Sequence, residues 1–267
     1  AVLAGFVLLP AFGVHASIKV GIVVNLVLAA LLCVPWPRPV TGWRWGVCGV
    51  SLAVAAAVIF MPGWDQQVMS TGPAIYARGY LERSKTDGMS AALHSDQILF
   101  YRDGPSATVA VTRDGDQRSL RVNGKVDAST SLADMPTQLM LGHLPLLVHP
   151  DPRAVLVIGL GGGTTAGAVA RHPVERLDVV EIEPAVIEAS RFFTRDNGDV
   201  LKDSRLRMAI ADGRNYLLTT PQRYDVIISE PSNPWIGGIA SLFSREFFEL
   251  ARQRLMPGGI MAQWVQA

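Results

Sequence analysis

Three acidic side chains each stand where an apolar run, of the kind that forms a buried strand, comes to its end. They are Glu181, Asp212 and Glu230. In an open parallel sheet, ligands bind beyond the carboxyl ends of the strands, in the crevice where the strand order reverses. We therefore expect the three carboxylates to face one pocket. Acids at strand ends also serve as helix caps or solvated loop residues, and this simpler interpretation stays open for each of them.

A glycine-rich turn indicates what the pocket holds. The stretch VLVIGLGGG is a predicted buried strand that runs into Gly159, Gly161 and Gly163. Glycines let the backbone turn sharply and approach a ligand closely, and the helix that follows directs its free N–H groups toward it. Glu181 lies 22 residues after Gly159, where an acid accepts hydrogen bonds from ribose hydroxyls. Because Thr164 replaces the last glycine of the dinucleotide fingerprint, the pattern favours an S-adenosyl nucleoside, although glycine turns also occur in plain strand–helix connections.

The other two acids suit the remaining parts of such a ligand. Asp212 can accept a hydrogen bond from the exocyclic amine of adenine, beside Gly213, which leaves room for the ring. Glu230 belongs to the segment SEPSNPW, whose two prolines stiffen a loop at the mouth of the crevice. A carboxylate held near a sulfonium can position or deprotonate an incoming amine, and general-base assistance is typically worth about 100- to 10,000-fold.

The elements that must position these residues alternate between strand and helix. From residue 151 to the end the pattern predicts a doubly wound, Rossmann-like α/β sheet. Two of the predicted helices lie between these strands. One runs from Pro184 to about Arg195, and the other is capped by Ser244 and runs through Leu255. The predicted strands are 155–158, 177–180, 206–210, 224–229 and 260–265.

A small antiparallel β domain is predicted before this sheet. Alternating segments at 97–102, 107–113 and 117–122 are separated by Asp-Gly pairs, which are strong hairpin signals. Residues 135–148 are predicted to be helical at first and broken at Pro145. We place a domain boundary at residue 150, which predicts a linker and hairpin domain over 63–150 and a nucleoside-binding domain over 151–267.

The first 62 residues are typical of membrane segments. They carry only Lys19, Arg38 and Arg44 as charged groups, and contain apolar runs at 1–14, 20–34 and 46–61. These runs predict transmembrane helices. A signal peptide is the alternative, against which three runs and the lack of a basic leader argue. The rest of the chain holds 21 basic and 23 acidic residues, so no basic field for nucleic acid is expected. Two isolated cysteines and scattered histidines give no support for a metal site.

Several collinear segments resemble the spermidine synthases, which are polyamine aminopropyltransferases. They are VLVIGLGGG, VVEIEPAVIEAS, ADGRNYL, YDVIISEPSNP and SLFSREFFELARQRLMPGGIMAQ, within a resemblance that covers about residues 80–267. The apolar N-terminal segments resemble the branch that carries a transporter-like membrane region. The resemblance implies a sheet of the S-adenosylmethionine methyltransferase type, decarboxylated S-adenosylmethionine as donor, an amine or polyamine acceptor and a homodimer. It also implies an integral membrane protein whose catalytic domain lies in the cytoplasm, where the donor is found.

The resemblance also implies roles for single residues. Gly159, Gly161 and Gly163 would line the donor, Glu181 would hold its ribose and Asp212 its adenine. Gln138 takes the place of a His or Gln that contacts the donor, and Glu230 takes that of the first acid in the Asp-Ser-Ser-Asp-Pro motif, the base for the attacking amine.

This chain departs from the family pattern at four places. The family's acid after its glycines is Gly162, the second acid of Asp-Ser-Ser-Asp-Pro is Asn233, and the Tyr and Glu that flank Gln138 are Thr137 and Leu139. Two other functions therefore stay open. One is an S-adenosylmethionine-dependent methyltransferase, because no acid at 162 repels the donor's carboxylate. The other is a non-catalytic sensor of nucleosides or polyamines.

Overall fold

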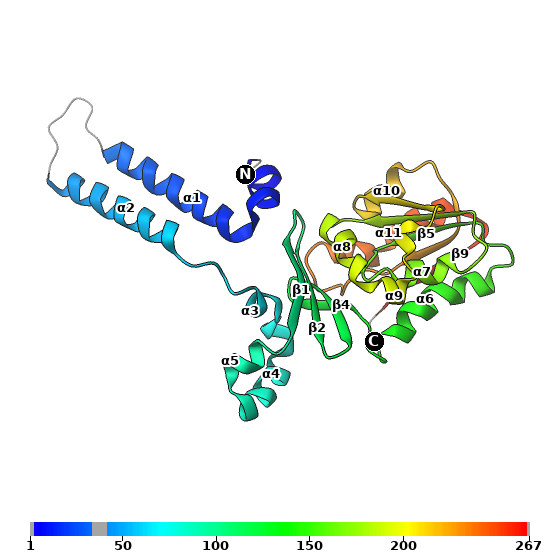
Figure 1. Cartoon of the computed structure of the whole chain (residues 1–267). Coiled ribbons are helices and arrows are strands. Elements are labelled where there is room, and N and C mark those ends of the chain that lie inside the picture. The colour runs from blue at the N-terminus through cyan, green and yellow to red at the C-terminus, as the bar shows by residue number, and fades with distance from the viewer. Residues whose placement is uncertain (1–2, 34–41, 266–267) are drawn as a thin grey trace. The chain divides into compact units, whose positions relative to one another are not determined.

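The computed structural model describes residues 3–33 and 42–265 (Figure 1). The described residues form two compact units. One comprises the residues up to Met69 together with Asp103–Pro105, and the other comprises Ser70–Arg102 and the residues from Ser106 onward.

The first unit is helical. The π-helix η1 (Ala4–Leu8) leads into α1 (Leu9–Cys33), and α2 (Gly42–Phe60) follows. The described part of the predicted run at 1–14 is helical, and Gly13, with a non-helical φ of +77° and ψ of 175°, separates it from the rest of α1. Of the helices in the described residues, only α1 is long and apolar enough to cross a membrane, and α2 has a shorter apolar part over residues 45–60. Arg38, in the predicted loop between the two runs, lies outside the described residues. Membrane insertion stays a prediction.

The second unit begins with helices and a four-stranded antiparallel sheet in the order β1-β2-β3-β4. The three predicted hairpin strands are confirmed, and a fourth strand follows Asn123-Gly124. Three helices occupy the chain before the first of these strands, and Pro73 lies in the first turn of α4, where its missing N–H is not needed. Helix α3 (Gln66–Ser70) ends at the boundary between the two units, and the elements that follow it are α4 (Pro73–Asp87), α5 (Met89–Leu93), β1 (Gln97–Asp103), β2 (Thr108–Asp114), β3 (Gln117–Val122) and β4 (Lys125–Ser129).

Helix α6 (Met135–Val148) is longer than predicted, because Pro145 does not break it. The proline has no N–H to donate, and this normally costs about 3 kcal/mol inside a helix. Here Pro145 and Leu146 are buried, and Leu146 belongs to the main core. The regular helical hydrogen bonding resumes at the end of α6, where the His149 N–H donates to the Pro145 carbonyl. Burial of this turn thus offsets the missing hydrogen bond.

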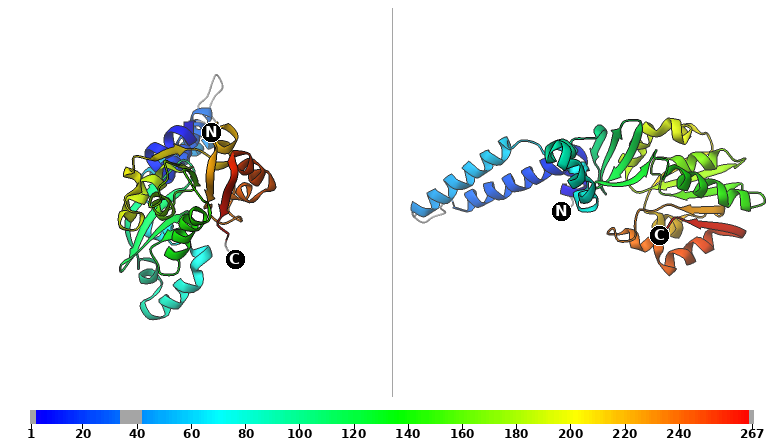
Figure 2. Two further views of the ribbon diagram at one scale, coloured as in Figure 1. Left: turned by 90° about the vertical axis from the view of Figure 1, so that its right-hand side faces the viewer. Right: turned by 90° about the horizontal axis from the view of Figure 1, so that it is seen from below.

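The predicted doubly wound sheet is present, with five parallel strands in the order β7-β6-β5-β8-β9 (Figure 2). The strand order reverses between β5 and β8. The strands are β5 (Ala154–Ile158), β6 (Arg176–Glu181), β7 (Leu206–Ile210), β8 (Tyr224–Ser229) and β9 (Leu255–Gln263). The intervening helices are α7 (Thr164–Ala170), α8 (Pro184–Ala189), η2 (Ser190–Phe193), α9 (Thr194–Asn197), η3 (Val200–Lys202), α10 (Gly213–Thr219), η4 (Ile239–Phe243) and α11 (Arg245–Arg254).

Two predicted boundaries were wrong. The single helix expected from Pro184 divides into α8, η2 and α9, since the Asn197 amide donates to the Ser190 carbonyl and takes it from the helical pattern. Strand β9 begins at Leu255 rather than Ile260. Its Pro-Gly-Gly segment forms a bulge against β8, where the register shifts, and Gly258 has a φ of +79°. The Ser244 cap is confirmed, because its hydroxyl accepts from the Phe247 N–H at 3.2 Å.

The small antiparallel sheet and the parallel sheet share one core. Val109, Val111 and Leu120 of the hairpins are fully buried in the same cluster as Val155 and Val157 of β5. A second cluster on the other face of the parallel sheet packs it against α10 and α11. The hairpins therefore pack directly against one face of the α/β fold.

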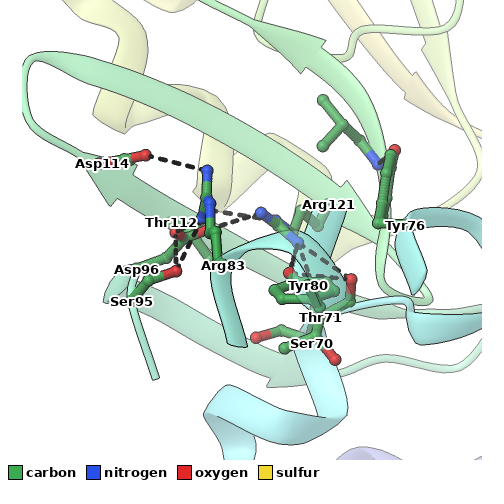
Figure 3. A network of polar contacts seen from close by, with 11 residues as sticks. Ser70, Thr71, Tyr76, Tyr80, Arg83, Ser95, Asp96, Thr112, Asp114 and Arg121 are labelled. Carbon is green, nitrogen blue, oxygen red and sulfur yellow. Dashed lines mark hydrogen bonds and ion pairs between the residues drawn. The ribbon is translucent and has the colours of Figure 1, made fainter. Parts of the chain in front are cut away.

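A buried arginine joins the first helices of this unit to the antiparallel sheet (Figure 3). Arg121 on β3 donates to the Thr112 hydroxyl on β2 at 3.2 Å and to the Ser70 carbonyl at 3.1 Å. Its second terminal nitrogen pairs with Asp96 at 2.6 Å, and the nitrogen that bonds Ser70 also donates to the Tyr80 hydroxyl of α4 at 3.4 Å. One side chain therefore satisfies groups from four segments.

The charges of this network balance within it. Arg83 lies between Asp96 and Asp114 at 3.9 and 3.7 Å, while Asp96 also pairs with Arg121. These four side chains line a cavity of ≈ 230 Å³. Two positive and two negative groups leave it without net charge, which indicates a structural network.

Replacing Arg121 by methionine is expected to lower the free energy of unfolding by about 3 kcal/mol, because Asp96 loses its buried partner and two buried acceptors lose their donor. Chemical denaturation of the purified protein measures this. Arg113→Met is the matched control, since Arg113 on β2 is exposed and should change stability by less than about 0.5 kcal/mol. Equal effects of the two substitutions would contradict the role given to Arg121.

Candidate active site

The strand-order reversal brings Gly159 and Glu230 together. The Glu230 N–H donates to the Ile158 carbonyl at 2.9 Å, so the two segments run side by side as they leave β5 and β8. Gly159 has a φ of +92°, and a Cβ there would lie 2.6 Å from the Glu230 carbonyl oxygen. Only glycine fits at this position, and it brings the predicted base next to the glycine loop, residues 159–163.

The rest of the glycine loop forms an open backbone cradle. Gly161 and Gly163 both have positive φ, +52° and +82°, and Gly163 caps α7. A Cβ on Gly161 would lie 3.5 Å from the Cβ of Ala128, so strand β4 of the antiparallel sheet passes over the loop. The crevice is therefore bounded by the glycine loop on one side and by β4 on another.

Glu181 holds the glycine loop in place. One carboxylate oxygen accepts from the Leu160 N–H at 2.9 Å and the other from the Glu183 N–H at 3.0 Å. The side chain is 8% exposed, and this burial raises its pKa against the opposing effect of the backbone hydrogen bonds. Glu181 thus has a structural task at the predicted position, and its contact with ribose stays a prediction.

Asp212 and Gly213 lie at the start of α10. The Asp212 carboxylate accepts from the Asn215 N–H at 2.8 Å, which makes it the helix cap. Gly213 packs on Ile158, because a Cβ there would come within 2.4 Å of an Ile158 methyl group, and this fixes α10 against the end of β5. The capping interpretation therefore holds for Asp212, and its contact with adenine stays a prediction.

Gln138 of α6 is brought to the same crevice. It is 4% exposed, and its amide donates to the Ser129 carbonyl at the end of β4 at 3.0 Å. Its backbone carbonyl accepts from the Thr165 hydroxyl at the start of α7 at 3.0 Å. Gln138 thus joins β4 to α7, and its predicted contact with the donor is not tested by these bonds.

Glu230 is surrounded by other polar groups. Removal from solvent raises its pKa to about 8, the negative charges of Asp134 and Asp127 act in the same direction, and a hydrogen bond with Thr165 opposes them. A carboxylic acid with such a pKa can take up or release a proton near neutral pH.

Asp127 and Asp134 were not predicted from the sequence. Asp127 on β4 accepts from the Ser232 hydroxyl at 2.7 Å and pairs with Lys125 at 2.6 Å. Asp134 accepts from the N–H of Ser129 at 2.6 Å, just before α6. Both lie in the hairpin region, far along the chain from Glu230. The turn pair Asn123-Gly124 was the available sequence signal, because such a pair indicates that the chain turns back and adds another strand to the sheet.

The departure at Gly162 has no steric cause. Its φ is not positive, and a Cβ would make ordinary contacts of 3.5 Å with the Phe193 ring and 3.6 Å with Ala128. A side chain could therefore begin at this position without backbone strain.

Comparison with known proteins agrees with this geometry. The spermine/spermidine synthase domain matches residues 135–266. A polyamine aminopropyltransferase from Archaeoglobus fulgidus is 36% identical over 168 residues, which are 63% of this chain and 61% of that protein. A spermidine synthase from Coffea arabica is 32% identical over 203 residues, 75% of this chain and 60% of that protein.

Solved structures show the same fold. A spermidine synthase in complex with the transition-state analogue AdoDATO superposes with a TM-score of 0.56 at 26% identity, over 62% of this chain and 57% of that one. The spermidine synthase from Thermotoga maritima gives a TM-score of 0.55 at 26% identity, over 62% and 56%.

The glycine loop and the three strand-end acids lie inside the matched region. The chain spans about three fifths of the length of the two sequence relatives. Residues 135–266 of this chain thus match the spermine/spermidine synthase domain, and the sequence relatives and solved structures that share this region are a polyamine aminopropyltransferase and spermidine synthases.

Proposed function

We propose that this protein is an aminopropyltransferase that moves an aminopropyl group from decarboxylated S-adenosylmethionine to an amine. The observation that carries the proposal is the position of Glu230, which the Gly159 contact places beside the glycine loop and which has a pKa of about 8. A base that titrates near neutral pH, next to a nucleoside cradle, suits deprotonation of an amine nucleophile.

In the proposed reaction the acceptor nitrogen attacks the propyl carbon next to the sulfonium. The new C–N bond forms as the C–S bond breaks, and the bonding electrons stay on sulfur, which leaves as a neutral thioether. The acceptor nitrogen gives its proton to the Glu230 carboxylate. Asp127 and Asp134 add negative charge to the crevice, which favours cationic donor and acceptor groups.

The glycine loop, Glu181, Asp212, Gly213 and Gln138 would bind the donor. They lie around the carboxyl ends of β5, β6 and β7 and beside α6, on the part of the crevice where Gly159 approaches Glu230. Glu181 would reach ribose by exchanging one of its loop hydrogen bonds for a ribose hydroxyl.

We also propose that α1 and α2 anchor the protein in a membrane with the catalytic unit in the cytoplasm. The length and apolar surface of α1 support the anchor, and the cytoplasmic origin of S-adenosyl donors supports the orientation. Dimer formation is proposed from the family alone.

Methyl transfer from S-adenosylmethionine is the second candidate. The ordinary contacts available to a Cβ at Gly162 favour it, because an acid could stand there but does not. Without that charge, the loop does not repel the carboxylate that distinguishes S-adenosylmethionine from its decarboxylated form.

Glu230→Gln is expected to retain donor binding but to lower kcat by about 100-fold or more, because the amide cannot accept the proton. Product formation and donor binding by calorimetry measure the two effects. Glu175→Gln is the control, since Glu175 is an exposed partner of Arg153 before β6 and should leave both values unchanged. Unaltered turnover in Glu230→Gln would rule out the assigned base.

Activity is expected to rise with pH as the Glu230 carboxyl ionises, with the lower limb of kcat/KM for the donor near pH 8. The charge of Asp127 raises this pKa, so Asp127→Asn should move the limb to lower pH. The profile is measured at saturating acceptor, so that ionisation of the free amine does not contribute. A limb at the same pH in both proteins would contradict the coupling between the two carboxylates.

Supplied with both donors at equal concentration, the protein is expected to form aminopropyl adducts, which mass spectrometry distinguishes from methyl adducts by their mass. Gly162→Asp should increase the preference for the decarboxylated donor by about 10-fold or more, since the new charge repels the carboxylate. Methyl adducts alone would establish the second candidate, and donor binding without any adduct would contradict both.

A further inference from the structure

Thr165 lies between the proposed base and helix α6. It is the second residue of α7 and is only 1% exposed. Its hydroxyl donates to the Gln138 carbonyl at 3.0 Å, and the same hydroxyl is hydrogen-bonded with the Glu230 carboxyl. A threonine hydroxyl has one hydrogen to donate and two lone pairs that accept. The carbonyl and the ionised carboxylate therefore compete for one hydrogen.

Close packing fixes the position of the Thr165 oxygen. A Cβ on Gly142 would lie 2.7 Å from the Thr165 carbonyl oxygen and 2.6 Å from the Cβ of Ala168, so α6 approaches α7 closely at a glycine. The backbone of Glu230 is fixed too, since its N–H donates to the Ile158 carbonyl at 2.9 Å. A β-branched side chain in a helix has few rotamers. The hydroxyl oxygen therefore stays in place, and its hydrogen is the part that can turn.

The Gln138 carbonyl can release this hydrogen at low cost. Gln138 lies inside α6, where a carbonyl also accepts the helical hydrogen bond from the residue four positions later. Hydrogen bonds to an ionised acceptor are roughly twice as strong as those between neutral groups. The hydrogen of Thr165 therefore favours Glu230 when the carboxylate is ionised and Gln138 when the carboxyl is protonated.

The charged groups that act on Glu230 oppose its ionisation. Residues 159–170, which form the glycine loop and α7, carry no charge, and segment 229–235 carries none besides Glu230 itself. The acids are Asp134, just before α6, and Asp127 on β4, which pairs with Lys125 at 2.6 Å. Both carboxylates favour the protonated form of Glu230. Thr165 supports the ionised form, which is the form that a base requires.

We propose that Thr165 is a positioning residue for the base, whose hydroxyl donates to the Glu230 carboxylate before proton transfer and to the Gln138 carbonyl after it. Once Glu230 has taken the proton of the acceptor amine, the hydrogen of Thr165 turns to Gln138, and the Thr165 oxygen accepts from the neutral carboxyl. One side chain thus orients the carboxyl in both states. This inference rests on the proposed role of Glu230 as the base.

Thr165→Val removes the hydroxyl and keeps the branched shape of the side chain. The ionised carboxylate then lacks a donor, so the lower limb of kcat/KM for the donor substrate should move to higher pH by about one pH unit. Activity at pH 7 should fall by about 10-fold, because the ionised fraction falls in that proportion below the limb. Activity above the limb should change little. The movement is opposite in sign to the one expected for Asp127→Asn.

Two further variants separate the hydroxyl from packing. Thr165→Ser keeps the hydroxyl and should return the limb to the pH of the unmodified protein. Thr112→Val is the matched control, because Thr112 is 3% exposed and its hydroxyl accepts from the Arg121 side chain at 3.2 Å. It should lower stability and leave the limb in place. A purely structural role for Thr165 predicts that same result for Thr165→Val, with lower activity at every pH.

Titration of the Glu230 carboxyl tests the hydrogen bond without turnover. NMR of the full chain with isotope-labelled glutamate carboxyl carbons gives its signal, which is identified by its absence in Glu230→Gln. The midpoint should rise in Thr165→Val and be restored in Thr165→Ser. An unmoved midpoint, or an equal rise in both variants, would overturn the inference and leave Glu230 as the base. Unaltered turnover in Glu230→Gln would instead overturn the base itself, whatever the midpoint does.

Discussion

The approach of the Gly159 backbone to the Glu230 carbonyl is the contact on which the rest of the site depends. The chain segments that follow the neighbouring strands β5 and β8 begin at the same edge of the sheet. Because Gly159 has no side chain, these two segments can stay hydrogen-bonded to each other there. One consequence is chemical, because the glycine loop and the Glu230 carboxylate are held next to each other by this contact. Another is structural, because Glu181 must then restrain the loop from its other side through the Leu160 N–H. Position and chemistry at this site are fixed by backbone rather than by long side chains.

Much of this arrangement could be predicted from the sequence, since it follows from regular elements. Strands that alternate with helices form a parallel sheet, and the ends of such strands must meet at one edge. The order of strands and helices along the chain is therefore enough to place Glu181, Asp212 and Glu230 at one edge of the sheet. Their individual bonds could not be predicted, because capping and loop restraint depend on local geometry. Asp212 proved to be a helix cap, which its sequence position alone could not distinguish from a ligand.

Residues that come to the site from outside the alternating strands and helices of the α/β sheet could not be predicted. The charges of Asp127 and Asp134 raise the pKa of Glu230 across a long stretch of sequence, and no local signal predicts that β4 lies over the glycine loop. Similarly, Pro145 is a reliable helix breaker in isolation, but burial of its turn reverses the outcome. The bulge in β9 is a third case, since Pro-Gly-Gly normally ends an element and here is absorbed into a strand. In each case long-range packing decided against a local preference.

Strand β4 has a consequence for how such a site can change over evolutionary time. Its Ala128 is fixed between the two sheets, where it contacts the glycine loop, while its neighbours Lys125, Asp127 and Ser129 make the polar bonds that border the crevice. A bulge in the pairing of β4 with β3 leaves Asp127 without a partner residue there, so a packed alanine and a polar side chain stand next to each other in one short strand. A change of charge at Lys125 or Asp127 can therefore leave the packing of Ala128 in place. Single substitutions along this segment can thus alter the charge that borders the crevice.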